Sequence, residues 1–368
     1  MLEPTLWRAI MHHPVVPIAP KPPVLTVCVP TYDRPQLVQR ALASIIGAAS
    51  GTIDQIEIIV SDNSPSVSEQ ACRAGLAAWP GRSTYLGNQQ NIGIAENLNQ
   101  CIAHASGQYL LFVHDDDVLL PGAVGTILEA LRRPQGDASV LMLGVHLVDV
   151  TGHVLHRQEF CRDQRITAPD ALERLLSDNG IAWFPGLVVR ADAYAAAGPF
   201  DSVVGNATDL DMWVRLFGRF GIQCVPGAVS GYTVHAGSAT QAMGVDRTAL
   251  GSLTAIFARA RQTGVLPEQV VERCQAQFIH QVILGAAYAA LRGGHRATAR
   301  RVLGTFGDPA IRGLRTPLEW LPARWITALV VGLPFAISQP LVALVDRLDL
   351  VRRIRAFGVR GRGSMPFC

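Results

Sequence analysis

Apolar runs that end abruptly in polar clusters constrain this chain more than any other feature. Residues 24–29 are almost continuously apolar and are closed by Pro30, and residues 56–60 and 109–113 follow the same pattern. Such runs are typical of strands buried on both faces of a parallel sheet. The segment between the first two runs carries apolar residues at helical spacing. The sequence therefore predicts an α/β fold, with a mainly parallel sheet covered by helices.

Three polar clusters come directly after these strands. They read PTYDR, SDNS and HDDD, and they begin at residues 30, 61 and 114. The carboxyl ends of parallel strands meet at one edge of a sheet, which is where ligands bind in folds of this class. We therefore expect a single cleft that collects all three clusters.

Further elements follow from the same patterns. Helices are expected over residues 36–46, 94–105, 169–176 and 208–220, and strands over residues 140–148, 186–190 and 225–229. The last helix is expected to begin at Thr208, with Asp209 and Asp211 in its first turn, where acids stabilise the helix dipole.

The 368 residues allow one domain with a sizeable core and a smaller appendage. We expect a proline-rich arm over residues 1–23, a sheet-containing domain over 24–245 and a helical region over 246–368. Residues 326–345 are uncharged and precede six arginines. Two prolines interrupt this run, so it suits a helix on a membrane surface, a membrane span or a soluble cap.

Composition excludes several classes of partner and chemistry. The formal net charge of +3 gives no case for nucleic-acid binding, and Lys21 is the only lysine, which excludes lysine-based mechanisms elsewhere in the chain. The seven cysteines show no Cys-x-x-Cys pair. They are expected to be reduced thiols in a cytoplasmic protein.

The acidic cluster after the third strand predicts a metal site. Asp115, Asp116 and Asp117 would repel one another after a buried strand unless a cation or hydrogen-bond donors compensated. Carboxylates suit Mg²⁺ or Mn²⁺, which bridge phosphate oxygens. His235, in an expected loop, is either an additional metal ligand or a merely exposed histidine.

Other polar residues allow two interpretations each. Asp209 and Asp211 either serve as a general base or only stabilise a helix, which Thr208 would cap. Asp62 either accepts a hydrogen bond from a nucleobase or ribose or only forms a turn. Asn91 either contacts a ligand or shapes a loop before a helix.

Together these segments resemble glycosyltransferase family 2, a group with the GT-A fold, over about residues 24–240. VPTYDRP looks like the opening nucleotide-binding loop, IIVSDNS like the second strand with its base-contacting Asp, and the stretch ending in FVHDDD like the DxD motif. ATDLDMWVRL resembles the Glu-Asp element before an aromatic helix, with Thr208 in place of the usual acid. YTVHAGSAT resembles the late loop that contains His.

The resemblance implies an inverting glycosyltransferase assisted by Mg²⁺ or Mn²⁺. It places the general base at Asp209, with Asp211 as the alternative, and metal ligands at Asp116, Asp117 and His235. The donor-binding positions that it implies are Pro30, Thr31, Tyr32, Arg34, Asp62, Asn91, Asp115 and Asp116.

The expected partners are a nucleotide-sugar donor and a saccharide or lipid-linked saccharide acceptor, in cell-surface polysaccharide or glycolipid synthesis. The basic, apolar C-terminal region predicts a place at the inner face of the cell membrane. One alternative is a catalytically silent relative that binds a nucleotide sugar and supports a membrane synthase. A nucleotidyltransferase would need a glycine-rich first loop and a catalytic lysine, and a dehydrogenase would need Gly-x-Gly-x-x-Gly where PTYDRP stands.

Overall fold

The structure is a computed structural model in which part of the chain is described. The described residues are 21–133, 138–178, 180–235, 245–333, 337–338, 340–342, 365 and 367–368. Most of the predicted arm over 1–23 lies outside them.

Four parallel strands form the first half of the sheet, in the order β3-β2-β1-β4. Their bounds are Leu25–Thr31 for β1, Ile56–Asp62 for β2, Arg82–Gly87 for β3 and Tyr109–Phe112 for β4. Every residue of β1, β2 and β4 is buried, as the continuous apolar runs predict. The predicted strands at 24–29, 56–60 and 109–113 are confirmed, whereas β3 is an additional strand at the sheet edge.

The second half of the sheet is mixed. Strand β9 (Leu187–Arg190) lies antiparallel between β4 and β6 (Val140–Val148), and β6 runs parallel to β10 (Ile222–Thr233). Three short strands pair antiparallel at this side, namely β5 (Val118–Leu119), β7 (Val154–Gln158) and β8 (Gln164–Ile166). The expectation of a mainly parallel sheet flanked by helices is confirmed, in the arrangement of a GT-A fold.

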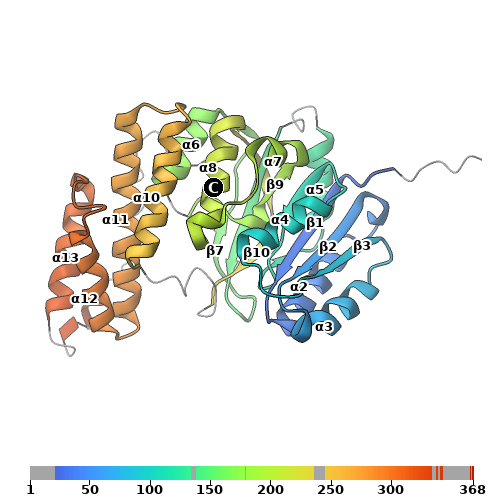
Figure 1. Ribbon diagram of the computed structural model, residues 1–368, viewed down its shortest axis with the longest axis horizontal. Coiled ribbons are helices and arrows are strands. Elements are labelled where there is room, and N and C mark those ends of the chain that lie inside the picture. The colour runs from blue at the N-terminus through green and yellow to red at the C-terminus, as the bar shows by residue number, and fades with distance from the viewer. Residues whose placement is uncertain are drawn as a thin grey trace, which may run out of the picture.

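Helices cover both faces of the sheet (Figure 1). Along β1, Leu25, Val27 and Val29 face the core shared with α2 (Pro35–Ala48), α3 (Pro65–Ala77) and α5 (Ala123–Arg132). Cys28 faces the other core, which includes residues of α4 (Ile94–His104), α6 (Ala168–Ser177), α7 (Ala191–Ala197) and α8 (Thr208–Phe220). This alternation follows from the two-residue period of a strand. Short 3-10 turns occupy Ile53–Gln55, Phe184–Gly186 and Ser202–Ala207 (η4).

The C-terminal region is helical in its described part. It contains α10 (Arg247–Gln262), α11 (Glu268–Arg292), α12 (Arg296–Gly304) and α13 (Leu321–Gly332), with short turns at Thr305–Gly307 and Leu318–Trp320. Phe257 of α10 and Phe278 of α11 belong to the same core as α8, and their ring centroids are 5.7 Å apart. Helices α12 and α13 lie at the opposite end of the molecule from β3 (Figure 1).

The apolar run at 326–345 is described only in part. Helix α13 ends at Gly332, and residues 334–336, 339 and 343–345 lie outside the described residues. Among the helices that the structure describes, none has both the length and the apolar character needed to cross a membrane.

Candidate functional site

The three polar clusters meet at the carboxyl edge of the first half of the sheet. Thr31 and Asp62 end β1 and β2 and lie opposite each other in the strand register. The backbone amide of Val113, one residue before the acidic turn, donates to the carbonyl of Cys28 in β1 at 2.9 Å. Parallel pairing therefore gathers segments that are up to 84 residues apart in the chain.

Arg34 ties the first cluster to the acidic turn. Its Nη1 lies 3.2 Å from Oδ1 of Asp115 and 3.0 Å from Oδ2 of Asp116. Thr31 Oγ1 donates to Oδ2 of Asp115 at 2.8 Å. Burial lowers the pKa of Arg34, but the two carboxylates outweigh that effect and raise it. The guanidinium therefore stays charged beside the acidic turn.

Asp116 is the best-compensated acid of the turn. His235 Nε2 lies 3.0 Å from its Oδ2, and Arg40 donates to its backbone carbonyl at 2.6 Å and to Thr233 Oγ1 at 3.3 Å. Burial opposes ionisation of Asp116, yet His114, His235 and Arg34 together hold its pKa below the ordinary value. The end of β10 is thus held against the acidic turn.

Asp117 is buried and only partly satisfied. Its Oδ1 accepts from the backbone amide of Thr233 at 2.9 Å, whereas Oδ2 has no hydrogen-bond partner among the described residues. Burial, together with the charge of Asp116, raises the pKa of Asp117 well above its ordinary value. A buried carboxylate oxygen without a partner is costly, and a cation would relieve that cost.

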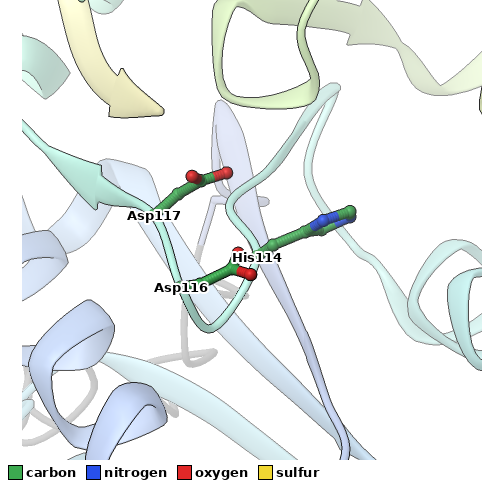
Figure 2. Close-up of side chains that lie close together, drawn as sticks. All are labelled: His114, Asp116 and Asp117. Carbon is green, nitrogen blue, oxygen red and sulfur yellow. The ribbon is translucent and has the colours of Figure 1, made fainter. Parts of the chain in front are cut away.

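His114, Asp116 and Asp117 project from the one turn that follows β4 (Figure 2). Each offers a ligand atom within 4.8 Å of the other two. The metal ligands expected from the sequence included His235 but not His114. The ring of His114 lies 4.7 Å from that of Phe184, and burial lowers its pKa, which favours the neutral imidazole that binds a metal. The only sequence signal for His114 was its place between a buried strand and three acids.

Asp62 and Asn91 shape the neighbouring loops. Asp62 Oδ1 accepts from the backbone amide of Ser64 at 2.9 Å, and Oδ2 accepts from the Tyr85 hydroxyl at 3.0 Å. Asn91 Oδ1 accepts from Asn63 Nδ2 at 3.1 Å and from the amide of Gly93 at 2.9 Å. Both residues therefore hold loops in place at the edge where the other clusters meet.

The remaining residues of the opening loop differ in exposure. Pro30 is buried within β1, whereas the Tyr32 side chain is 52% exposed. Asp33 has a φ of 56°, so the chain bends in the left-handed region next to Tyr32. The exposed aromatic ring is available to a ligand at this edge.

Asp209 lies in the first turn of α8, on the face that carries Trp213 one turn later. The Trp213 ring is 5.4 Å from that of Phe184, which in turn contacts His114. Asp209 thus shares a helix face with Trp213, whose ring contacts lead through Phe184 to His114. Burial raises the pKa of Asp209 to about 6, although the amide of Leu210 donates to its Oδ1 at 2.6 Å.

Asp211 is fully buried and paired. Arg215 donates to its Oδ2 at 2.8 Å, and Arg259 of α10 lies 2.6 Å from both carboxylate oxygens. Asp211, the alternative base, is thus ion-paired with two guanidinium groups.

Thr208 is the first residue of α8, as expected, but it does not cap the helix. The cap position is Ala207, without a side-chain hydrogen bond. The hydroxyl of Thr208 is buried and has no hydrogen-bond partner among the described residues. The interpretation of Thr208 as a cap is therefore wrong, because its side chain points into the protein.

Comparison with known proteins agrees with this geometry. The model of the family described as glycosyl transferase family 2 matches residues 26–195. A Campylobacter jejuni protein named GalNAc(5)-diNAcBac-PP-undecaprenol beta-1,3-glucosyltransferase is 35% identical over 201 residues, which are 53% of this chain and 60% of that protein. The chain thus matches less than two thirds of that relative's length.

Two solved structures share the fold. Staphylococcus aureus TarS 1–349, in complex with UDP-GlcNAc, has a TM-score of 0.56 at 15% identity, with 91% of this chain and 90% of that chain covered. The mannosyltransferase PcManGT of Pyrobaculum calidifontis, in complex with GDP-Man and Mn²⁺, has a TM-score of 0.51 at 18% identity, with 94% of each chain covered.

The family match covers β1 to α7 and includes the opening loop and the whole acidic turn. The described part of the chain has the GT-A fold of the two solved enzymes, and its polar clusters meet at the edge where such sheets bind ligands. The chain belongs to glycosyl transferase family 2 and is a glycosyltransferase.

Proposed function

We propose that the chain transfers a sugar from a nucleotide-diphosphate donor to an acceptor hydroxyl, with inversion and with the assistance of Mg²⁺ or Mn²⁺. The observation that carries this proposal is the acidic turn after β4. His114 and two carboxylates meet there, and one buried oxygen of Asp117 has no partner among the described residues. Binding of GDP-Man and Mn²⁺ by PcManGT, which shares the fold, supports it.

The donor would lie across the carboxyl ends of β1, β2 and β4. Asp62 would contact the base or ribose, and the exposed ring of Tyr32 would pack against the nucleoside. Arg34 already faces two acids of the turn and would also face the diphosphate. The proposed donor-binding residues are Pro30, Thr31, Tyr32, Arg34, Asp62, Asn91, Asp115 and Asp116.

Asp116 and Asp117 would hold the metal, and His235 would complete the site from the end of β10. His235 lies 3.0 Å from Asp116, which supports its inclusion, and His114 brings a second nitrogen within reach. A bound Mg²⁺ or Mn²⁺ would supply positive charge for the diphosphate leaving group. The chain itself buries Asp117 away from water and favours the ionised form of the neighbouring Asp116.

Asp209 is the proposed general base. It would accept the proton of the acceptor hydroxyl while that oxygen attacks the anomeric carbon in a single displacement, which inverts the configuration. Its pKa of about 6 suits this role near neutral pH. We set Asp211 aside, because Arg215 and Arg259 neutralise it in the core.

The proposed setting is cell-surface polysaccharide or glycolipid synthesis, with a saccharide or lipid-linked saccharide as acceptor. The name of the Campylobacter relative refers to an undecaprenol-linked saccharide, which supports a lipid-linked acceptor here. We propose that the chain acts in the cytoplasm at the inner face of the membrane. In this scheme residues 24–245 hold the site and residues 246–368 form a helical region beside it.

Calorimetric titration with UDP, GDP and dTDP, with and without Mn²⁺, tests the donor site. The wild type should bind one nucleotide in a metal-dependent manner, and Asp116→Asn should abolish that dependence. Asp54→Asn, an exposed acid in the turn before β2, is the matched control and should bind as the wild type does. A folded wild-type protein that binds none of the three nucleotides would contradict the proposal.

A further inference from the structure

Exposed apolar side chains are concentrated on one short part of the chain. Of the thirteen large apolar side chains that are exposed in the described residues, six lie between residues 318 and 341. They are Leu318, Trp325, Ile326, Leu329, Ile337 and Leu341. Single exposed apolar residues are ordinary on a protein surface, but a contiguous group marks an interaction site.

Three members of this group lie on helix α13. Trp325 is 74% exposed, Ile326 44% and Leu329 65%, and the spacing of Trp325 and Leu329 puts them one turn apart. Val330 and Val331 lie on the opposite face, buried in a cluster with Leu291 and Ala299 of α11 and α12. The helix is thus apolar on both sides, and among the described residues only the side of Val330 and Val331 is covered.

The one charged residue of α13 is turned away from the exposed face. Arg324 places its guanidinium 4.2 Å from the Phe306 ring centroid and donates to Thr316 Oγ1 at 2.8 Å. The exposed face of α13 therefore carries no charged side chain whose hydration would oppose its burial in an apolar phase.

The surrounding sequence is strongly basic. Residues 296–362 contain twelve arginines against four acids, a net charge of +8, whereas residues 1–295 contain 20 basic and 25 acidic residues, a net charge of −5. Arg300, Arg301, Arg312 and Arg315 are exposed in the described part of this segment. In the sequence, the apolar face of α13 therefore lies within a basic segment, after a longer stretch of net negative charge.

We propose that the exposed face of α13 docks on the surface of an anionic phospholipid bilayer and lies in the plane of its interface. With 12 residues the helix is about 18 Å long, against about 30 Å for a hydrocarbon core, so it is too short to span. Tryptophan favours the interface, and each arginine near an anionic surface adds about 1 kcal/mol of attraction.

A second copy of the chain is a poorer occupant for this face. Docking α13 against itself would bring two segments of charge +8 together, whereas anionic lipid neutralises that charge. The inference rests on the proposed function for its purpose, since docking would hold the site beside an acceptor carried in lipid.

Flotation of the full chain with vesicles tests the docking. The wild type should bind vesicles of phosphatidylcholine with phosphatidylglycerol, bind phosphatidylcholine alone weakly, and lose affinity as salt is added. Leu329→Glu should weaken binding at least about tenfold, because an exposed leucine that would enter the lipid interface is replaced by a charge that the anionic surface repels. Ile53→Glu, an exposed apolar residue before β2, is the matched control and should bind as the wild type does.

Equal binding of Leu329→Glu and wild type would overturn the docking, as would an α13-dependent dimer that ignores vesicles. Circular dichroism should show that both variants fold, since both side chains are exposed. Nucleotide titration separates the two proposals. Failure to bind vesicles with intact nucleotide binding would reject only the docking, and vesicle binding without nucleotide binding would reject only the proposed function.

Discussion

At the scale of single residues, Asp209 has the most informative environment. Burial raises its pKa to about 6, and the proposed base must be deprotonated to accept a proton. We therefore expect kcat/KM to rise with pH and to level off above an apparent pKa of about 6. A pH profile measured with saturating metal checks this. A profile that is flat through that range would exclude Asp209 as the base.

Substitution of Asp209 should separate chemistry from binding. Asp209→Asn should lower the transfer rate by at least about a hundredfold, because a general base is lost, and should leave donor binding unchanged. Asp192→Asn, an exposed acid in α7, is the control. A donor Kd that changes as much as the rate would show that Asp209 contributes to binding instead.

The same substitution should affect stability in a pH-dependent way. Because the folded-state pKa of Asp209 is raised, the folded chain holds this proton more tightly than the unfolded chain does, and wild-type stability falls as pH rises through the interval up to about 6. Asp209→Asn avoids this loss. Its free energy of unfolding should exceed that of the wild type above that interval by roughly 2 to 3 kcal/mol and match it in acid. Urea denaturation at several pH values measures the difference.

The sequence reveals the polar residues that follow each buried strand, but it does not reveal which side chains contact them. Asp116 and Asp117 stand out because adjacent acids after a buried strand need compensation. His114 gave little signal in the sequence, since its setting depends on Phe184, which is distant in the chain. Likewise, the residue pattern alone left both Asp209 and Asp211 open as the base, and the structure separates them because Arg215 and Arg259 pair with Asp211.

At the scale of elements, a buried ion-pair cluster joins α8 to α10. Arg259 lies 2.6 Å from Asp211 of α8 and 2.7 Å from Asp201, which caps η4. Arg259→Met would leave Asp211 with Arg215 as its only described ion pair. We expect a loss of about 2 kcal/mol in the free energy of unfolding, since the buried Asp211 would lose one of the two cations that compensate its charge.

The exposed pair of Arg273 with Glu173 provides the comparison for that measurement. Arg273→Met should cost less than about 1 kcal/mol, because exposed ion pairs contribute little. Equal losses in the two variants on chemical denaturation would show that the buried cluster does not stabilise the junction.

The turn from α8 into β10 depends on a glycine. Gly221 has a φ of +67°, and a Cβ there would meet the carbonyl of Ile166. Gly221→Ala should therefore destabilise the chain by more than about 1 kcal/mol. Gly125→Ala in α5 should instead stabilise it by up to about 1 kcal/mol, because nothing lies within 4 Å of that position and alanine favours a helix. Opposite signs in thermal denaturation are the expected result.

Elements were predictable where burial was complete. Strands β1, β2, β4 and β6 have continuous apolar runs and were found, as was α8 with its full length. Strand β3 was missed, because at the sheet edge it is half-exposed and its sequence RSTYLG shows no apolar run. Strands β5 and β8 have two and three residues, too few for a periodic signal.

At the scale of the whole molecule, the sheet-containing region and the helical region share one hydrophobic core. The helical character of residues beyond 245 was predictable from composition, but their packing was not. Phe257 and Phe278 complete the core that contains α8, and Arg259 neutralises Asp211 beneath the proposed base. The proposed catalytic segment therefore depends on α10 and α11 for its stability.

Truncation tests this dependence directly. A chain ending at residue 245 should lose its cooperative thermal transition and its near-ultraviolet dichroism, because it exposes the α8 core and leaves Asp211 without Arg259. A chain ending at residue 314 is the control, since both truncations lose α13 and the contact of Phe367 with Phe160, but only the first loses α10 and α11. The longer chain should unfold cooperatively and bind nucleotide. If the shorter chain did so equally well, residues 24–245 would be an independent domain and the shared core would be dispensable.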